Sequence, residues 1–129
     1  MLEKVVEDVI GRAKGLAQEH GFSVCISVVD ASGLQAGFLR MDDAIPGAID
    51  IAIKKARTAA LFRTDSAVIG EGARPGGAIY SLEATNGGLI SFGGGVVLQD
   101  AQGKVIGAVG ISGATVEADQ IIAVGAARP

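Results

Sequence analysis

Glycine makes up 20 of the 129 residues, and most of these glycines lie in the second half of the chain, between Gly70 and Gly113. Because glycine has no side chain, it lets a backbone approach another backbone, or a ligand, more closely than other residues allow. The chain holds only three prolines and no tryptophan. We therefore expect a closely packed domain in which helices, or a flat ligand, lie directly against a glycine-rich sheet.

Length and composition describe one ordinary domain that comprises residues 1–129. Hydrophobic residues make up 49% of the chain and charged residues 19%, which suffices to bury a core. The net charge of −3 offers no basic surface, so we expect no nucleic-acid partner. The apolar runs are far shorter than the roughly 18 residues that cross a bilayer, and charges occupy the N-terminus, where a signal peptide would be apolar. The sequence thus predicts a cytoplasmic protein without a membrane partner.

Hydrophobic residues recur at spacings of three and four in several stretches, which is the pattern of an amphipathic helix. Gly21 provides a stop for the first helix, Pro46 suits the first turn of the second, and Thr115 provides a cap for the last. The predicted helices cover residues 2–19, 46–62, 66–70 and 116–126.

Runs rich in β-branched residues predict strands between these helices. Four-residue turns that end in glycine, at 30–33 and 100–103, join two pairs of runs into antiparallel hairpins. The order of elements predicts an α+β fold, with a single, mostly antiparallel sheet of about five strands packed against helices. The predicted strands cover residues 23–29, 34–40, 89–92, 96–99 and 105–111.

Basic residues gather toward the C-terminal half of the second helix, at Lys54, Lys55, Arg57 and Arg63. Cations in this position complement the negative end of the helix dipole. We interpret them as a solvated face of the helix and not as a binding surface.

Several segments match one known family in order and separation, and they span nearly the whole chain. The most specific are the sequence KARTA at 55–59 and the sequence GAVGISG at 107–113. The full set is Ser27–Asp30 with Gly33, Arg40–Asp42, Lys54–Phe62, Gly93–Gly94 and Gly103–Gly113.

With these segments, the chain resembles the haem-degrading family of HbpS-like and GlcG-like proteins, which also occurs as the C-terminal domain of PduO-type corrinoid adenosyltransferases. The resemblance implies a profilin-like α/β layer that forms dimers or larger homo-oligomers and binds haem or another small ligand. It is less specific for activity, because the family includes haem binders and accessory proteins in redox stress. One departure is Val96, which stands where the GGxP pattern of the family has proline.

His20 is the only histidine, which excludes a site with two histidine ligands in one subunit, and we predict no metal site apart from haem. A haem iron can be held by one histidine, so His20 is the candidate axial ligand. The alternative role for His20 is to stabilise the C-terminus of the first helix through its dipole. Tyr80 and Met41 carry the other conceivable axial atoms, although both suit packing.

The segment from Thr64 to Asn86 has weak periodicity and places polar residues among glycines, as in loops that present a site on a rigid scaffold. Glu71 and Arg74 are the candidate catalytic residues, acting as an acid and a polarising cation. Structural caps and surface charges are the alternative role for each residue. The predicted ligand-binding residues are Arg74, Tyr80, Asn86, Gly93, Gly94 and Gly95.

Other chemistries lack their sequence signatures. Cys25 is the single cysteine and has no basic neighbour in sequence, which predicts a buried, unreactive thiol. Ser112 is not part of a G-x-S-x-G motif, so a hydrolase is poorly supported. Neither a GxGxxG motif that opens a helix nor a P-loop is present, which argues against a nucleotide-binding fold.

Three functions remain open at this point. The leading hypothesis is a homo-oligomeric binding protein for haem or a similar flat or acidic small ligand. The first alternative is a cofactor-independent enzyme, such as a lyase, isomerase or cyclase, that acts on a small acidic metabolite at a subunit interface. The second alternative is a non-catalytic accessory protein of a metabolic operon.

Overall fold

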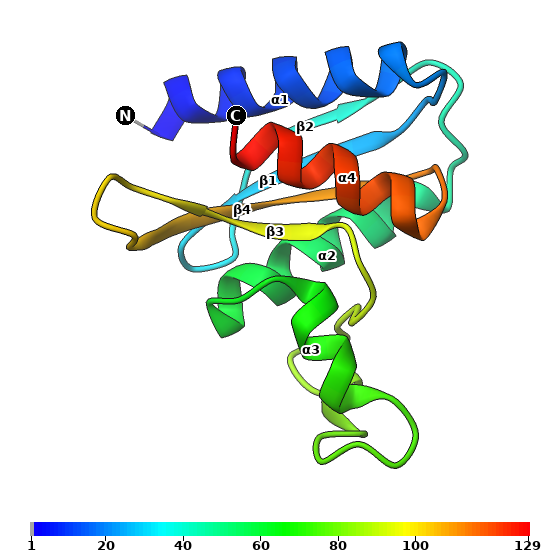
Figure 1. The fold of residues 1–129 in the computed structure, drawn as a ribbon, viewed down its shortest axis with the longest axis vertical. Coiled ribbons are helices and arrows are strands. Elements are labelled where there is room, and N and C mark those ends of the chain that lie inside the picture. Colours follow the sequence, from blue (N-terminus) through cyan, green and yellow to red (C-terminus); the bar gives the residue numbers. More distant parts are fainter. Residues whose placement is uncertain (1) are drawn as a thin grey trace.

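A computed structural model describes residues 2–129 and shows an α+β fold with one open sheet (Figure 1). The helices are α1 (Leu2–Glu19), α2 (Ala48–Phe62), α3 (Ser66–Ala73) and α4 (Val116–Ala127), with one 3-10 turn, η1 (Leu82–Ala84). The strands are β1 (Cys25–Asp30), β2 (Gln35–Arg40), β3 (Gly95–Gln99) and β4 (Val105–Ser112).

The sheet has the strand order β2-β1-β4-β3, and every neighbouring pair is antiparallel. α1 and α4 cover one face of the sheet, and α2 covers the other. Residues 64–92, which we call the arm, contain α3 and η1 and project beyond α2 (Figure 1). None of the helices described within residues 2–129 is both long and apolar enough to cross a bilayer.

Both predicted hairpins form, and an aspartate closes each turn in the same way. Oδ1 of Asp30 accepts hydrogen bonds from the backbone N–H groups two and four residues further on, at 2.8 and 3.0 Å. Oδ1 of Asp100 repeats this arrangement at 2.9 Å for both bonds. Gly33 and Gly103 complete the turns in the left-handed conformation, with φ of 81° and 84°. The turn chemistry in the sequence therefore predicted the two hairpins correctly.

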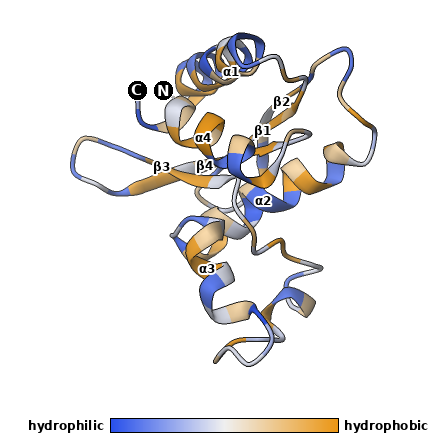
Figure 2. Ribbon diagram, turned by 45° about the vertical axis from the view of Figure 1, so that its right-hand side comes forward, coloured by the Kyte–Doolittle hydropathy of each residue, from blue (hydrophilic) through white to orange (hydrophobic). Residues whose placement is uncertain are grey.

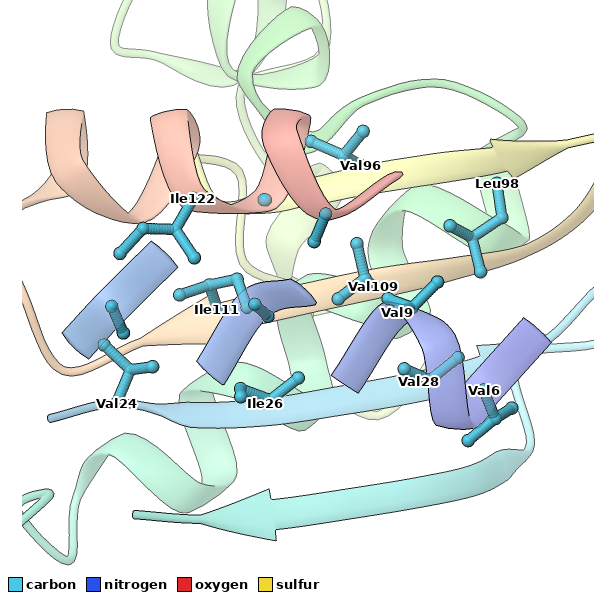
Figure 3. Packing of buried hydrophobic residues seen from close by; sticks show 14 residues of the cluster. Val6, Val9, Val24, Ile26, Val28, Val96, Leu98, Val109, Ile111 and Ile122 are labelled. Atoms are coloured by element: carbon cyan, nitrogen blue, oxygen red, sulfur yellow. The ribbon is translucent and has the colours of Figure 1, made fainter. Parts of the chain in front are cut away.

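The larger part of the core lies between the sheet and the helices α1 and α4 (Figure 3). Branched aliphatic side chains from β1, β3, β4 and α4 meet those of α1 there. α1 carries both hydrophobic and hydrophilic residues (Figure 2), and the hydrophobic ones recur at the helical spacing that the sequence predicted. The labelled residues are Val6, Val9, Val24, Ile26, Val28, Val96, Leu98, Val109, Ile111 and Ile122. Val96, the departure from the GGxP pattern, is thus a core residue of β3.

α2 packs on the opposite face of the sheet through alanines and against glycines. Gly95 and Gly110 face each other across β3 and β4. A Cβ atom on Gly110 would lie 2.1 Å from the carbonyl oxygen of Ala52, and one on Gly95 would lie 2.3 Å from that of Lys55. The helix backbone therefore rests directly on the sheet backbone. This close approach confirms the structural role expected of the glycines in the sheet.

The predicted strand at 89–92 does not form, so the sheet has four strands and not about five. The backbone of this segment is satisfied by side chains instead of a neighbouring strand. The Ile90 amide donates to Oγ1 of Thr58 at 3.1 Å, and the Phe92 carbonyl accepts from Oγ of Ser66 at 2.7 Å. Sequence periodicity carries no information on such bonds, which explains the wrong prediction.

α3 is longer than predicted, because it continues past Gly70 to Ala73. A Cβ atom on Gly70 would lie 1.9 Å from the carbonyl oxygen of Ser91. This glycine is therefore a point of close packing inside the helix and not its end. α2 begins at Ala48, two residues later than predicted from Pro46.

Candidate functional site

Two neighbouring hollows lie at the C-terminal end of α1. The larger one, of about 440 Å³, is lined by residues of α1, the loop after it, and the end of β2. The smaller one, of about 60 Å³, is apolar and lies between the loop and α4. Phe22 lines both hollows, so they adjoin at this side chain. The larger hollow is lined by Lys14, Gln18, Gly21, Phe22, Ser23, Leu39, Arg40, Met41, Asp42 and Asp43, and the smaller one by His20, Phe22, Ala118, Ile121 and Ile122.

The end of α1 fixes the position of the loop between the two hollows. Gly21 has a φ of 77°, which turns the chain out of the helix, as its sequence position predicted. The amides of Gly21 and Phe22 then donate to carbonyl oxygens of the last helical turn at 3.1 and 2.8 Å. His20 is therefore held at a defined place while its side chain remains exposed.

The surroundings of His20 are mostly apolar. Ile121 of α4 is 62% exposed, although it is a large aliphatic residue beside the histidine. Phe22 is half-buried next to it. No group of three or more metal-ligating side chains is present in residues 2–129, so a cation would find one protein ligand here and not a complete set.

Met41 and Arg40 line the larger hollow and are both tied to the backbone. Sδ of Met41 accepts a hydrogen bond from the Val24 amide at 3.4 Å, which matches the packing role that we considered for it. Arg40 donates from Nε and Nη2 to the carbonyl oxygen of Ala44, at 3.2 and 3.0 Å. These bonds fix the guanidinium group in place, although Arg40 as a whole is exposed to solvent.

The predicted site residues Glu71, Arg74, Tyr80 and Asn86 all lie exposed on the arm. Nε of Arg74 donates to the backbone carbonyl of Glu71 at 3.0 Å, which is a bond that caps the end of α3. Tyr80 lines a shallow hollow of about 380 Å³ that is formed by residues 77–82 and Thr85. The structure thus joins the Arg74 side chain to the backbone of Glu71, and it places neither residue in the hollow that contains Tyr80.

Gly93, Gly94 and Gly95 are buried at the base of the arm. The amide of Gly94 donates to Oε1 of Gln120 at 2.8 Å, and that of Gly95 donates to Oγ of Ser66 at 2.9 Å. Their nearest neighbours come from α2, α3, α4 and β4, and not from the polar residues of the arm. Ligand binding by these glycines remains a prediction.

A buried ion pair that was not predicted from the sequence joins Lys55 of α2 and Asp119 of α4. Nζ of Lys55 lies 3.1 Å from Oδ2 of Asp119 and 2.8 Å from the carbonyl oxygen of Ile111. Both side chains are almost inaccessible, at 0% and 4% exposure. The same ammonium group lies 5.0 Å from the ring centroid of Phe92. The interpretation of Lys55 as part of a solvated face is therefore wrong.

Burial acts on both charges of this pair. It lowers the pKa of Lys55 and raises the pKa of Asp119, and the attraction between the two groups opposes each shift. Oδ1 of Asp119 also accepts from the Ala114 amide at 3.0 Å. Each charge thus has fixed polar partners, which is what keeps a buried pair from destabilising the fold.

A signal for the buried lysine was present in the sequence. Ala48, Ala52 and Ala59 define the apolar stripe of α2, and Lys55 lies on that stripe at a spacing of three from Ala52 and four from Ala59. Counting helical spacings from the alanines, instead of grouping the basic residues, would have placed Lys55 against the sheet.

Comparisons with known proteins give the family of the chain. A sequence profile described as haem degrading protein HbpS-like matches residues 3–128. A 15.0 kDa protein in the dhaT-dhaS intergenic region of Citrobacter freundii is 39% identical over 131 residues, which cover 94% of this chain and 90% of the relative. The corrinoid adenosyltransferase PduO of Citrobacter freundii is 41% identical over 108 residues, which cover 83% of this chain and 32% of the relative.

A solved structure of a PduOC:heme complex has the same fold. It superposes with a TM-score of 0.90 at 36% identity, and the match covers 95% of this chain and 89% of the other. The resemblance predicted from the KARTA and GAVGISG segments is thus confirmed. Because the profile matches almost every residue, the chain belongs to the haem-degrading HbpS-like family.

Proposed function

We propose that this protein is a homo-oligomeric haem-binding protein in which His20 is an axial ligand of the iron. The observation that carries the proposal is the position of the only histidine, exposed at the edge of an apolar hollow. The relative with the same fold at 36% identity was solved as a heme complex, which supports haem over other flat ligands. Cytoplasmic location and the profilin-like assignment remain predictions alongside it.

The surroundings of His20 match the chemistry of haem. An imidazole nitrogen of His20 would hold the iron, and burial of the apolar face of the macrocycle against Phe22 and Ile121 would lower the free energy of the complex. Met41 is tied to a backbone amide, and Tyr80 lies on the arm, so neither is placed as well as His20. The iron and its macrocycle would supply redox or haem-degrading chemistry once bound.

The size of the apolar hollow supports an oligomer. At about 60 Å³ it is far below the roughly 300 Å³ of a small ligand pocket, so one subunit covers only part of a macrocycle. Large apolar side chains also stay exposed on α4, among them Val116 at 43% and Ile121 at 62%. A second copy of the chain is the partner that we propose for these surfaces, and light scattering that reports a monomer at micromolar concentration would contradict it.

Spectroscopic titration of the purified protein with haemin tests the proposal. We expect a Soret band with a low-spin shift in the wild type, and His20→Ala should abolish that shift. The fold should persist, because a histidine at a helix end contributes only about 0.3 to 1 kcal/mol to stability. Tyr80→Phe is the matched control for loss of another candidate ligand and should leave the spectrum unchanged. A His20→Ala spectrum identical to that of the wild type would exclude His20 as the ligand.

A further inference from the structure

The larger hollow next to His20 contains two cationic side chains that the proposed haem site does not use. Lys14 and Arg40 line it together with the apolar side chains of Phe22 and Leu39. Gly21 and Phe22 follow His20 directly in the chain, so this hollow begins within one or two residues, at about 3.8 Å per residue, of the proposed axial ligand. A flat ligand held at His20 would therefore extend past Phe22 toward the larger hollow.

We infer that this hollow binds the carboxylate groups of the haem, with Lys14 and Arg40 as their cationic partners. The inference rests on the proposed function and adds the orientation of the ligand to it. Haem is an apolar disc with two carboxylates on one edge. The surface around Phe22 has the same division, because its apolar part lies on the His20 side and its charged part lies on the Lys14 side.

Lys14 is available for such a contact. Within residues 2–129, its ammonium group takes part in none of the hydrogen bonds or ion pairs that the structure contains. Lys4, on the same helix, differs in this respect because it pairs with Asp8 at 2.9 Å. An unpaired ammonium group beside an apolar surface is suited to a carboxylate of a ligand that covers that surface.

Arg40 is positioned in advance for the same task. Two of its guanidinium nitrogens, Nε and Nη2, donate to the Ala44 carbonyl, which leaves Nη1 for a ligand. Because these bonds fix the side chain, little conformational entropy is lost when it contacts a carboxylate. Variants of Arg40 would also disturb the loop that it holds, so Lys14 offers the cleaner test.

Asp42 and Asp43 line the same hollow and act in the opposite sense. Their carboxylates repel those of the ligand, so the net attraction depends on Lys14 and Arg40. Removal of one acidic charge should therefore strengthen the binding of a diacid.

The test compares haemin with its dimethyl ester, which has the same macrocycle and iron but no carboxylates, in the same detergent buffer. Lys14→Gln should weaken haemin binding about fivefold, the effect of an exposed ion pair, and should leave binding of the ester unchanged. Asp42→Asn should strengthen haemin binding about twofold, and again only for the diacid. Lys4→Gln, which removes an equal charge from the same helix, should change neither.

Three outcomes decide the matter. The inference is overturned when Lys14→Gln binds haemin as tightly as the wild type, or weakens haemin and the ester equally. That result leaves the proposed function standing, because the Soret band of the wild type and its loss in His20→Ala are measured separately. Absence of any haemin binding by the wild type overturns both.

Discussion

The body of the molecule, which comprises residues 2–63 and 93–129, and the arm differ in what holds their backbones in place. In the body, branched aliphatic side chains fill one face of the sheet, and α2 rests on glycines at the other. In the arm, the buried hydrophobic residues are few, namely Ile69, Ala73 and Leu89. Backbone turns and a few side-chain bonds hold the arm instead. The Ile79 amide donates to the Gly72 carbonyl at 2.9 Å, and the Ser91 amide donates to the Glu83 carboxylate at 3.1 Å.

This difference indicates how each region responds to substitution. A residue in the body is surrounded by close-packed neighbours, so a change in volume or charge affects the whole fold. An exposed residue on the arm has room to move, so its replacement affects local order and any ligand bound there. Three substitutions test this contrast, from the largest expected effect on stability to the smallest.

Lys55→Met should destabilise the protein most, by about 3 to 5 kcal/mol, because it leaves Asp119 buried without its cation. Urea denaturation measures the change. The double variant Lys55→Met with Asp119→Asn should be much less destabilised than the sum of its single variants, since no unpaired charge remains and the asparagine oxygen still accepts from Ala114.

A loss below about 0.5 kcal/mol for Lys55→Met would be typical of a surface residue. It would show that the pair contributes nothing to the body, contrary to its burial. Equal losses for the double variant and for the sum of the single ones would show that the two charges act independently.

Gly110→Ala should come next, with a loss of about 1 to 3 kcal/mol from overpacking. The new methyl group would lie 2.1 Å from the Ala52 carbonyl oxygen, and both partners are backbone that cannot rotate away. Gly15→Ala is the matched control, because no atom of a neighbouring element lies within 4 Å of the position that its methyl group would take, and alanine favours the helix by about 0.5 to 1 kcal/mol. Denaturation curves that move in the same direction for both variants would contradict the packing of α2 on the sheet.

The same contrast explains which parts of the structure could be predicted from the sequence. The helices and hairpins of the body have signals in the sequence, namely the spacing of hydrophobic residues and the residues of the turns. For this reason α1, α4 and both hairpins were predicted closely. The conformation of the arm depends on single hydrogen bonds, such as that from the Ile90 amide to Thr58, which leave no periodic pattern in the sequence. A strand was therefore predicted wrongly at this position. For the site, His20 was identified because it is the only histidine. The hollow beside it is lined by Lys14 of α1 and Arg40 of β2, and no local sequence pattern connects these two elements.

Arg74→Ala should have the smallest effect on stability, below about 0.5 kcal/mol, because the side chain is exposed and only one of its nitrogens is bonded, to the Glu71 carbonyl. If the arm binds a small acid, Arg74→Ala should lower the affinity for that acid more than it lowers the stability of the fold. Malonate serves as the probe, and calorimetry should show a loss of about 1.5 to 3 kcal/mol for Arg74→Ala. Arg74→Lys should recover only part of the affinity, since it restores the charge without the fork of donors.

Haemin affinity is the control for this last prediction, and it should be the same in Arg74→Ala and in the wild type, because His20 and Lys14 lie on the body. Equal malonate affinity in Arg74→Ala and in the wild type would refute a carboxylate site on the arm. Binding of small acids would then be expected at the hollow beside His20, and Lys14→Gln would be the variant that weakens it. The arm would in that case contribute exposed apolar side chains, such as Ile79 and Tyr80, to contacts between copies of the chain and not to a ligand.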